Sequence, residues 1–175
     1  MEPPTRSAIK IPKWEVKNLK IKTKDLTLVV MFAALYAALV YVFAPISFLA
    51  LQFRIAGVLR PAIAKKWILA FGYVIGVVIG NFSSPNLGIL ELLFMPIMSL
   101  FAGLLGYLIA KKVRGNYFVC GAVIATVIAL SVAWMLSQFG LPFFSTFLYL
   151  FISEQIVCLI GSGVFKMLDT RFEWW

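Results

Sequence analysis

Two glutamates lie inside stretches of apolar residues, where a charged side chain is least expected. Glu91 stands in GILELLFMPIMSLF (residues 88–101), and Glu154 stands in FISEQIVCLI (residues 151–160). An Asp, Lys or Arg in the middle of a membrane span costs about 2.5–3.5 kcal/mol on insertion scales. Ionisable residues in such places usually face a cavity, form a pair or serve transport. The two carboxylates are therefore the first candidates for chemistry in this chain.

Further polar residues fall at a similar depth in neighbouring apolar segments. The predicted substrate-binding residues are Glu91, Glu154, Asn81, Arg54, Gln155 and Gln52. Carboxylates accept N–H donors, and amides offer both donors and acceptors. No comparable group is expected in the inner halves of the segments. The set therefore predicts a pocket that is open to the outside, closed towards the cytoplasm, and suited to an N–H edge or a positive charge.

The charge balance of this pocket leaves three alternatives open. Arg54 is the only cation expected in the outer half of the segments, where it faces two carboxylates. In one alternative Arg54 pairs with Glu91 or Glu154 as a structural bridge. In the second, the carboxylate left without a cation binds a ligand that offers several N–H donors or a positive charge. In the third, one glutamate is protonated in the free protein.

The chain lacks the residues on which most catalytic and metal sites depend. It contains no histidine, and Cys120 and Cys158 lie in separate apolar runs rather than in a CxxC pair. It also lacks a phosphate loop of the G-x-x-x-x-G-K type. We therefore expect no enzyme activity and no metal or other cofactor, and we expect the cysteines to be buried core residues.

Composition places the chain among membrane proteins. Hydrophobic residues make up 62% and charged residues 13% of the 175 residues, and the mean hydropathy is +0.97. Soluble domains are about 45–50% apolar and about 25% charged. The formal charge of +9 is concentrated at the ends of the chain and between the apolar segments. This distribution favours contact with a lipid bilayer rather than with nucleic acid.

Six apolar segments of helical character are predicted at residues 26–44, 51–64, 67–81, 87–110, 117–136 and 144–168. A membrane span needs about 20 residues, so the second and third segments are short. Connections 45–50, 82–87 and 137–143 contain no Lys or Arg. The remaining connections and the C-terminus carry Arg60, Lys65, Lys66, Lys111, Lys112, Arg114, Lys166 and Arg171.

This alternation of basic and uncharged connections predicts the topology. By the positive-inside rule, it favours an all-α bundle of six transmembrane helices in the plasma membrane, with both termini in the cytoplasm. A five-span alternative would leave one basic connection outside. The predicted organisation is a basic cytoplasmic or interfacial segment at 1–24, a six-helix membrane domain at 25–168 and a cytoplasmic tail at 169–175.

Small residues recur at helical spacing in two of the segments. Gly72, Gly76 and Gly80 repeat every four residues, and Ala33, Ala34, Ala37 and Ala38 form two overlapping A-x-x-x-A pairs. Such stripes let helix backbones approach closely in lipid. Packing within the bundle and docking of another membrane subunit both remain open.

The order of these motifs resembles the QueT-type substrate-binding S components of energy-coupling factor transporters. The motifs are LQFRIAGVLRP (residues 51–61), IGNFSSPNLGILELLF (79–94) and SEQIVCLIGSGVF (153–165), and the resemblance covers about residues 24–168. The chain departs from the family pattern where IAGVL replaces I-S-E-A-L, so that Ala56 or Gly57 stands in place of an acidic residue.

The resemblance implies a function in uptake. It implies a six-helix binding protein that works with a transmembrane coupling subunit and two cytoplasmic ATPase subunits. It also implies a small heterocyclic ligand, a deazaguanine-like precursor of queuosine, bound near the outer surface. The docking surface for the coupling subunit would be the alanine stripe, Ala33, Ala34, Ala37 and Ala38. A stand-alone secondary transporter or channel for a small cationic or polar solute is the alternative.

Overall fold

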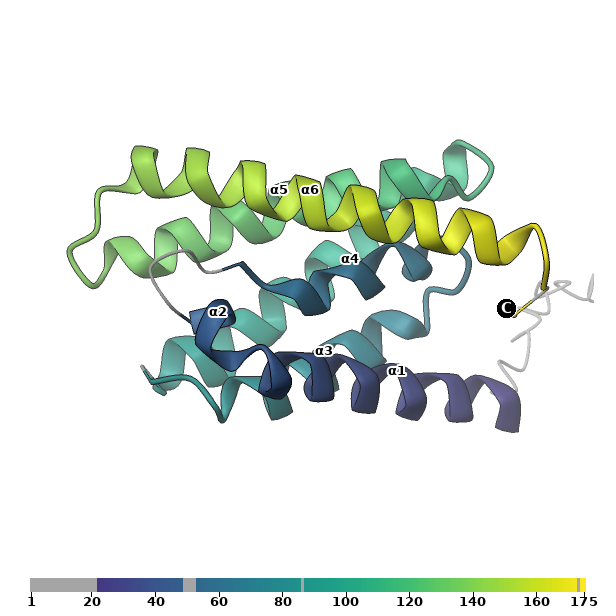
Figure 1. The fold of residues 1–175 in the computed structure, drawn as a ribbon, viewed down its shortest axis with the longest axis horizontal. Helices are drawn as coiled ribbons and strands as arrows, with labels where there is room; N and C mark the ends of the chain where they lie inside the picture. Colours follow the sequence, from purple (N-terminus) through teal and green to yellow (C-terminus); the bar gives the residue numbers. More distant parts are fainter. Residues whose placement is uncertain (1–21, 49–52, 86, 173) are drawn as a thin grey trace, which may run out of the picture.

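The described part of the chain is a bundle of helices (Figure 1). The computed structural model describes residues 22–48, 53–85, 87–172 and 174–175. In chain order the elements are α1 (Thr23–Val42), α2 (Ala44–Phe48), η1 (Ile55–Ala64), α3 (Leu69–Asn81), η2 (Leu90–Phe94), α4 (Met95–Lys112), α5 (Tyr117–Ser137) and α6 (Phe143–Asp169). η1 is a 3₁₀-helix and η2 is a π-helix. These ranges contain no strand, and the predicted all-α fold is confirmed.

Four helical stretches are long and apolar enough to cross a membrane. They are Thr23–Val42, Leu90–Lys112, Tyr117–Ser137 and Phe143–Asp169. The 10 residues of η1 and the 13 residues of α3 each cover only about 20 Å. The hydrocarbon core of a bilayer is about 30 Å thick, so neither element spans it alone. The second and third segments are thus short as expected, and the count of six spans stays a prediction.

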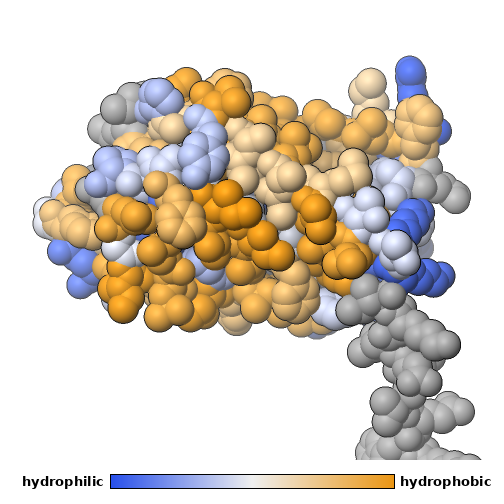
Figure 2. Space-filling view, turned by 90° about the horizontal axis from the view of Figure 1, so that it is seen from below, coloured by the Kyte–Doolittle hydropathy of each residue, from blue (hydrophilic) through white to orange (hydrophobic). Residues whose placement is uncertain are grey.

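The connections between helices gather at two ends of the bundle (Figure 1). The start of α1, the η1–α3 connection, the α4–α5 connection and the end of α6 lie together. We call this the basic end, because it carries Lys65, Lys66, Lys111, Lys112, Arg114 and Lys166. α2, the end of α3 and the α5–α6 connection lie at the opposite end (Figure 1). Figure 2 shows a largely apolar surface between these more hydrophilic ends, as a membrane protein requires.

Two ion pairs hold the basic end together. Lys66 Nζ pairs with Asp25 at the start of α1, and Lys65 Nζ lies 3.3 Å from Oδ2 of Asp169 at the end of α6. The η1–α3 connection is therefore tied to both the first and the last helix. Of the predicted N-terminal segment at 1–24, residues 1–21 lie outside the described residues.

The glycine stripe of α3 packs inside the bundle, against α1. A Cβ added at Gly72 would lie 2.7 Å from the Val29 carbonyl oxygen, and one added at Gly76 would lie 2.8 Å from Cβ of Tyr36. Such approaches are possible only for glycine, which has no Cβ. Of the two alternatives left by the sequence, internal packing is the one that the structure shows for this stripe.

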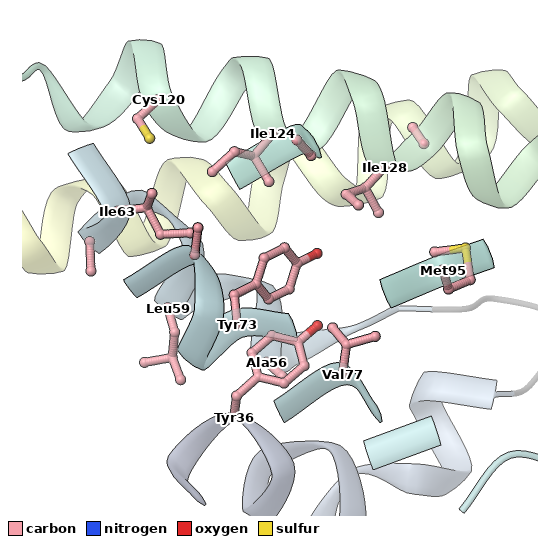
Figure 3. Packing of buried hydrophobic residues seen from close by; sticks show 14 of the residues in the cluster. Tyr36, Ala56, Leu59, Ile63, Tyr73, Val77, Met95, Cys120, Ile124 and Ile128 are labelled. Carbon is pink, nitrogen blue, oxygen red and sulfur yellow. The ribbon is translucent and has the colours of Figure 1, made fainter. Parts of the chain in front are cut away.

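η1 lies in the middle of the bundle rather than at its surface. Eight of its ten residues are buried, and it contacts α1, α3, α4, α5 and α6. Figure 3 shows Leu59 and Ile63 of η1 among core side chains that include Tyr36 of α1, Tyr73 of α3 and Ile124 of α5. The Tyr36 and Tyr73 rings meet edge to face, with centroids 5.2 Å apart. A short element therefore organises the packing of the long ones.

η1 makes a close backbone contact with α6 at a glycine. A Cβ added at Gly161 would overlap the carbonyl oxygen of Val58, so the α6 backbone lies directly against the η1 backbone. Gly163, two residues further along α6, is exposed and has no atom near an added Cβ. The two glycines of one helix thus meet opposite steric conditions.

We predict that Gly161→Ala lowers the free energy of unfolding by at least about 2 kcal/mol, because the new methyl group must displace η1. Gly163→Ala is the matched control and should leave stability unchanged or raise it by about 0.5–1 kcal/mol, since alanine favours helix. Thermal unfolding of the purified proteins in one detergent measures both. Equal melting temperatures for Gly161→Ala and the wild type would contradict the close contact between η1 and α6.

Candidate functional site

A buried ion pair joins η1 to α6 at mid-bundle. Arg60 is 0% exposed and Glu154 is 4% exposed. Arg60 Nη1 donates to Oε2 of Glu154, and Arg60 Nη2 lies 3.5 Å from Oε1. Nη2 also lies 3.4 Å from the Tyr36 hydroxyl, and the guanidinium carbon is 5.4 Å from the centroid of the Tyr73 ring. Four elements, α1, η1, α3 and α6, therefore meet at this guanidinium.

This placement of Arg60 corrects one expectation drawn from the sequence. Arg60 was expected in a basic connection, together with Lys65 and Lys66, and that expectation is wrong for Arg60. The physical reason is that Glu154, buried in α6, supplies the opposite charge that a buried guanidinium requires. The expectation that Arg54 is the only cation available to the two carboxylates is therefore also wrong, because Arg60 pairs with Glu154.

Glu154 and Gln155 point to different sides of α6. Successive residues of an α-helix are about 100° apart, and Glu154 faces η1. Gln155 Nε2 instead donates to the Ala122 carbonyl oxygen at 3.2 Å and to Thr126 Oγ1 at 3.1 Å, both on α5. The structure thus does not bring Gln155 to the cavity described below. Gln52 lies outside the described residues.

The π-helix η2 shapes the backbone around Glu91. The N–H of Met95 donates to the carbonyl of Leu90, five residues back, instead of to Glu91. The π-helical donor for the Glu91 carbonyl would be residue 96, which is Pro96 and has no N–H. Asn81 fills this gap, because its Nδ2 donates to the Glu91 carbonyl oxygen at 2.7 Å. The end of α3 is thereby fixed to η2.

Arg54 completes this arrangement from the other side of Asn81. Arg54 Nη2 donates to Oδ1 of Asn81 at 2.9 Å, and its guanidinium carbon lies 5.5 Å from the ring centroid of Phe48. In the described ranges, no ion pair joins Arg54 to Glu91 or to Glu154. The structural bridge left open by the sequence is therefore formed by Arg60 and Glu154 instead.

The side chain of Glu91 is buried and forms no ion pair within the described ranges. Glu91 is 5% exposed, and its Oε2 has no hydrogen-bond partner among the described residues. The buried hydroxyl of Ser47 on α2 has none either. Ser84 lies within hydrogen-bonding reach of the Glu91 carboxylate, and Arg54 acts on it through space. A buried polar group without a partner costs about 1–3 kcal/mol, which makes Oε2 a natural acceptor for a ligand.

These groups surround one small cavity towards the opposite end of the bundle. Its lining includes Ser47, Arg54, Asn81, Glu91 and Glu154 as the polar residues, with Phe48, Met95, Val132, Met135 and Leu150 as the apolar ones. The cavity volume is about 20 Å³, enough for roughly one water molecule. Four of the six predicted substrate-binding residues thus share one cavity. Ser47 was not predicted as a site residue, since a lone serine near an apolar segment carries no signal.

The motif order and the helical architecture both point to one family of transporters. A family model described as QueT transporter matches residues 26–170, a range that contains most of α1 and all of the later helices to the end of α6. The chain belongs to the QueT transporter family. QueT proteins are membrane transporters of a small substrate and not enzymes, and the resemblance seen in the sequence is confirmed. No curated protein and no solved structure matches the chain.

We predict that breaking the Arg60–Glu154 pair is costly, whereas removing both charges is less so. Arg60→Met and Glu154→Leu should each lower the free energy of unfolding by about 3–5 kcal/mol, because each leaves one buried charge unpaired. The double variant should lose at least about 2 kcal/mol less than the sum of the two, which a double-mutant cycle in detergent measures. Gln155→Leu is the control on the neighbouring face and should cost about 1 kcal/mol. Additive losses would show that the two side chains do not interact.

Proposed function

We propose that this QueT chain is the substrate-binding subunit of an ATP-driven vitamin-type importer. In this proposal the chain lies in the plasma membrane, with its basic end and both termini in the cytoplasm. The cavity beside Glu91 then faces outward and captures a small heterocycle, a deazaguanine-like precursor of queuosine. A transmembrane coupling subunit and two cytoplasmic ATPase subunits supply the energy.

The observation that carries the proposal is the buried Oε2 of Glu91, which has no hydrogen-bond partner among the described residues. A guanine-like base presents a ring N–H and an amino group side by side, and one carboxylate can accept from both. Glu154 already accepts from Arg60, whereas Oε2 of Glu91 has no partner in the described residues. We therefore assign recognition of the base to Glu91. Arg54 and Asn81 offer donors for a carbonyl on the opposite edge of the ring.

Binding a heterocycle requires the cavity to widen. Ligand pockets commonly measure about 300–1,000 Å³, far more than the roughly one water volume present here. Met95 and Met135 line the cavity, and methionine side chains adapt readily to new shapes. The described conformation is thus a contracted one, and ligand binding would be coupled to movement of these side chains.

The layer beneath the cavity favours a binding protein over a channel. Arg60, Tyr36 and Tyr73 are each at most 1% exposed, and they fill the bundle between the cavity and the basic end. A continuous polar path would have to pass through this packed layer. Release of ligand to the other side then needs a larger rearrangement, which supports a partner that consumes ATP.

A docking surface for the coupling subunit is available on α1. Ala33 and Ala37 are buried against α3, so the proposal rests on the exposed Ala34 and Ala38. These two alanines line an apolar groove of about 600 Å³. Its other lining residues are Leu28, Met31, Phe32, Leu35, Leu59, Ala62, Leu69, Phe165 and Trp174. Small residues at the floor of an apolar groove suit close approach of a partner helix.

We expect Glu91→Gln to weaken binding of a deazaguanine base by about 10- to 100-fold, since a charged acceptor is lost. Its unfolding temperature should stay equal to that of the wild type or rise, because a buried carboxylate is neutralised. Glu154→Gln is the contrasting variant, and its main effect should be a lower unfolding temperature. Equilibrium dialysis and thermal unfolding of the purified proteins separate the two effects. Unchanged binding by Glu91→Gln would remove Glu91 from the recognition site.

The importer assignment has its own test. The purified chain alone, reconstituted in liposomes, should bind the base and not transport it. Uptake by the chain alone would show a self-sufficient transporter instead. Mass spectrometry of small molecules that co-purify with the chain identifies the ligand independently, and a flavin or thiamine in place of a guanine-like base would change the substrate and keep the importer.

We further expect Ala34→Phe combined with Ala38→Phe to reduce co-purification with the coupling and ATPase subunits several-fold. The bulky rings would fill the groove on α1, while ligand binding should persist because the cavity is untouched. Ala122→Phe on the exposed side of α5 is the control and should leave assembly intact. Equal assembly of the double variant and the wild type would exclude this face of α1 as the docking surface.

A further inference from the structure

A second cleft lies at the basic end, far from the cavity beside Glu91. It has a volume of about 600 Å³ and is formed by the α4–α5 connection, the start of α5 and the end of α6. Its charged lining residues are Lys65, Arg114, Lys166 and Asp169. Three positive charges and one negative charge leave a net charge of +2.

Two of these cations have no ion-pair partner among the described residues. Asp169 is bound by Lys65 at 3.3 Å, whereas neither Arg114 nor Lys166 takes part in an ion pair within the described ranges. Lys166 Nζ lies 5.7 Å from the centroid of the Phe118 ring, which keeps its stem against α5. The cleft therefore presents one guanidinium and one ammonium group to an anion.

The backbone holds Arg114 in an uncommon conformation. Arg114 has φ +61°, and the next residue, Gly115, has φ +69°. The N–H of Gly115 donates to the Ala110 carbonyl at 2.9 Å, which ends α4. A left-handed conformation at a residue other than glycine costs about 1–2 kcal/mol, so the connection places the arginine at an energetic cost. The N-terminus of α5 is separately capped by the Asn116 side chain, which accepts from the N–H of Phe118 at 2.8 Å.

The cleft also has an apolar border. Val113 is 45% exposed and Phe118 is 36% exposed, and both line the cleft beside the cations. Charged and apolar groups side by side, at the end of membrane-spanning helices, match the boundary between lipid headgroups and acyl chains. Basic clefts between helices on the cytoplasmic side bind anionic lipid headgroups.

We propose that this cleft binds the phosphate of an anionic phospholipid. Arg114 and Lys166 hold the phosphate oxygens, since charge-assisted hydrogen bonds to phosphate are strong and arginine matches the geometry of phosphate. Val113 and Phe118 contact the upper part of the acyl chains. A bound lipid fastens the α4–α5 connection to the end of α6 and so holds the basic end at the membrane surface. The inference does not depend on the ligand bound beside Glu91.

The test uses the full-length protein in detergent with added lipid. Native mass spectrometry counts bound phosphatidylglycerol and, in a parallel arm, phosphatidylcholine. We expect the wild type to retain phosphatidylglycerol in preference. Arg114→Gln combined with Lys166→Gln should reduce this retention roughly tenfold or more, because each basic residue near a headgroup contributes on the order of 1 kcal/mol. Lys166→Gln alone should give an intermediate loss and leaves the backbone at Arg114 untouched.

A control with the same change in charge separates the cleft from the surrounding surface. Lys111→Gln combined with Lys112→Gln removes two cations from the same end, at the last turn of α4 and outside the cleft. This variant should retain phosphatidylglycerol as the wild type does. Equal loss in both double variants would overturn the proposal in favour of diffuse attraction. Displacement of the lipid by millimolar inorganic phosphate would also overturn it, because the site would then be one for free phosphate.

Discussion

The ion pair between Arg60 and Glu154 is the constraint around which the bundle is arranged. Removing two charges from water is so costly that such a pair is stable only when geometry and further contacts are favourable. Here the guanidinium also lies against Tyr36 and Tyr73. The element that carries Arg60 must therefore run through the middle of the bundle, although it is too short to span a membrane. The contact of Gly161 with Val58 lets η1 lie close enough to α6 for the pair to form.

The same pair determines which acidic residue is left for a ligand. Once Glu154 is bound to Arg60, the acidic residue at the cavity that has no ion-pair partner in the described ranges is Glu91. The backbone around Glu91 is irregular because Pro96 cannot donate, and Asn81 satisfies the carbonyl that results. Irregular π-helical turns are frequent at functional sites. A structural ion pair and a π-helical turn thus accompany one carboxylate oxygen, Oε2 of Glu91, that has no partner among the described residues beside a small cavity.

The sequence predicts those features that depend on composition, spacing and motif order. It predicts the all-α class and the family, and it also predicts a shared pocket for Arg54, Asn81, Glu91 and Glu154. The prediction made from the sequence is wrong for Arg60. An arginine that stands beside Pro61 and shortly before two lysines looks like part of a basic cytoplasmic connection. Only the tertiary position of Glu154 shows otherwise. Gln155 fails to reach the cavity for a simpler reason: the residue after a buried one points about 100° away on the helix. The glycine stripe of α3 could not be assigned from spacing, because close packing within a chain and between chains has the same pattern.

Residues on two sides of η1 contribute to two different proposed binding surfaces. Arg60 contacts Glu154, which lines the cavity, while Leu59 and Ala62 line the groove beside α1. A ligand donor that competes for the oxygens of Glu154 must weaken the contact to Arg60. At Gly161 the backbones of η1 and α6 are in direct contact, with no free space between them. Any shift of η1 along α6 therefore also moves Leu59 and Ala62. The cavity and the groove are thus joined through η1, because η1 binds Glu154 of the cavity and supplies Leu59 and Ala62 to the groove.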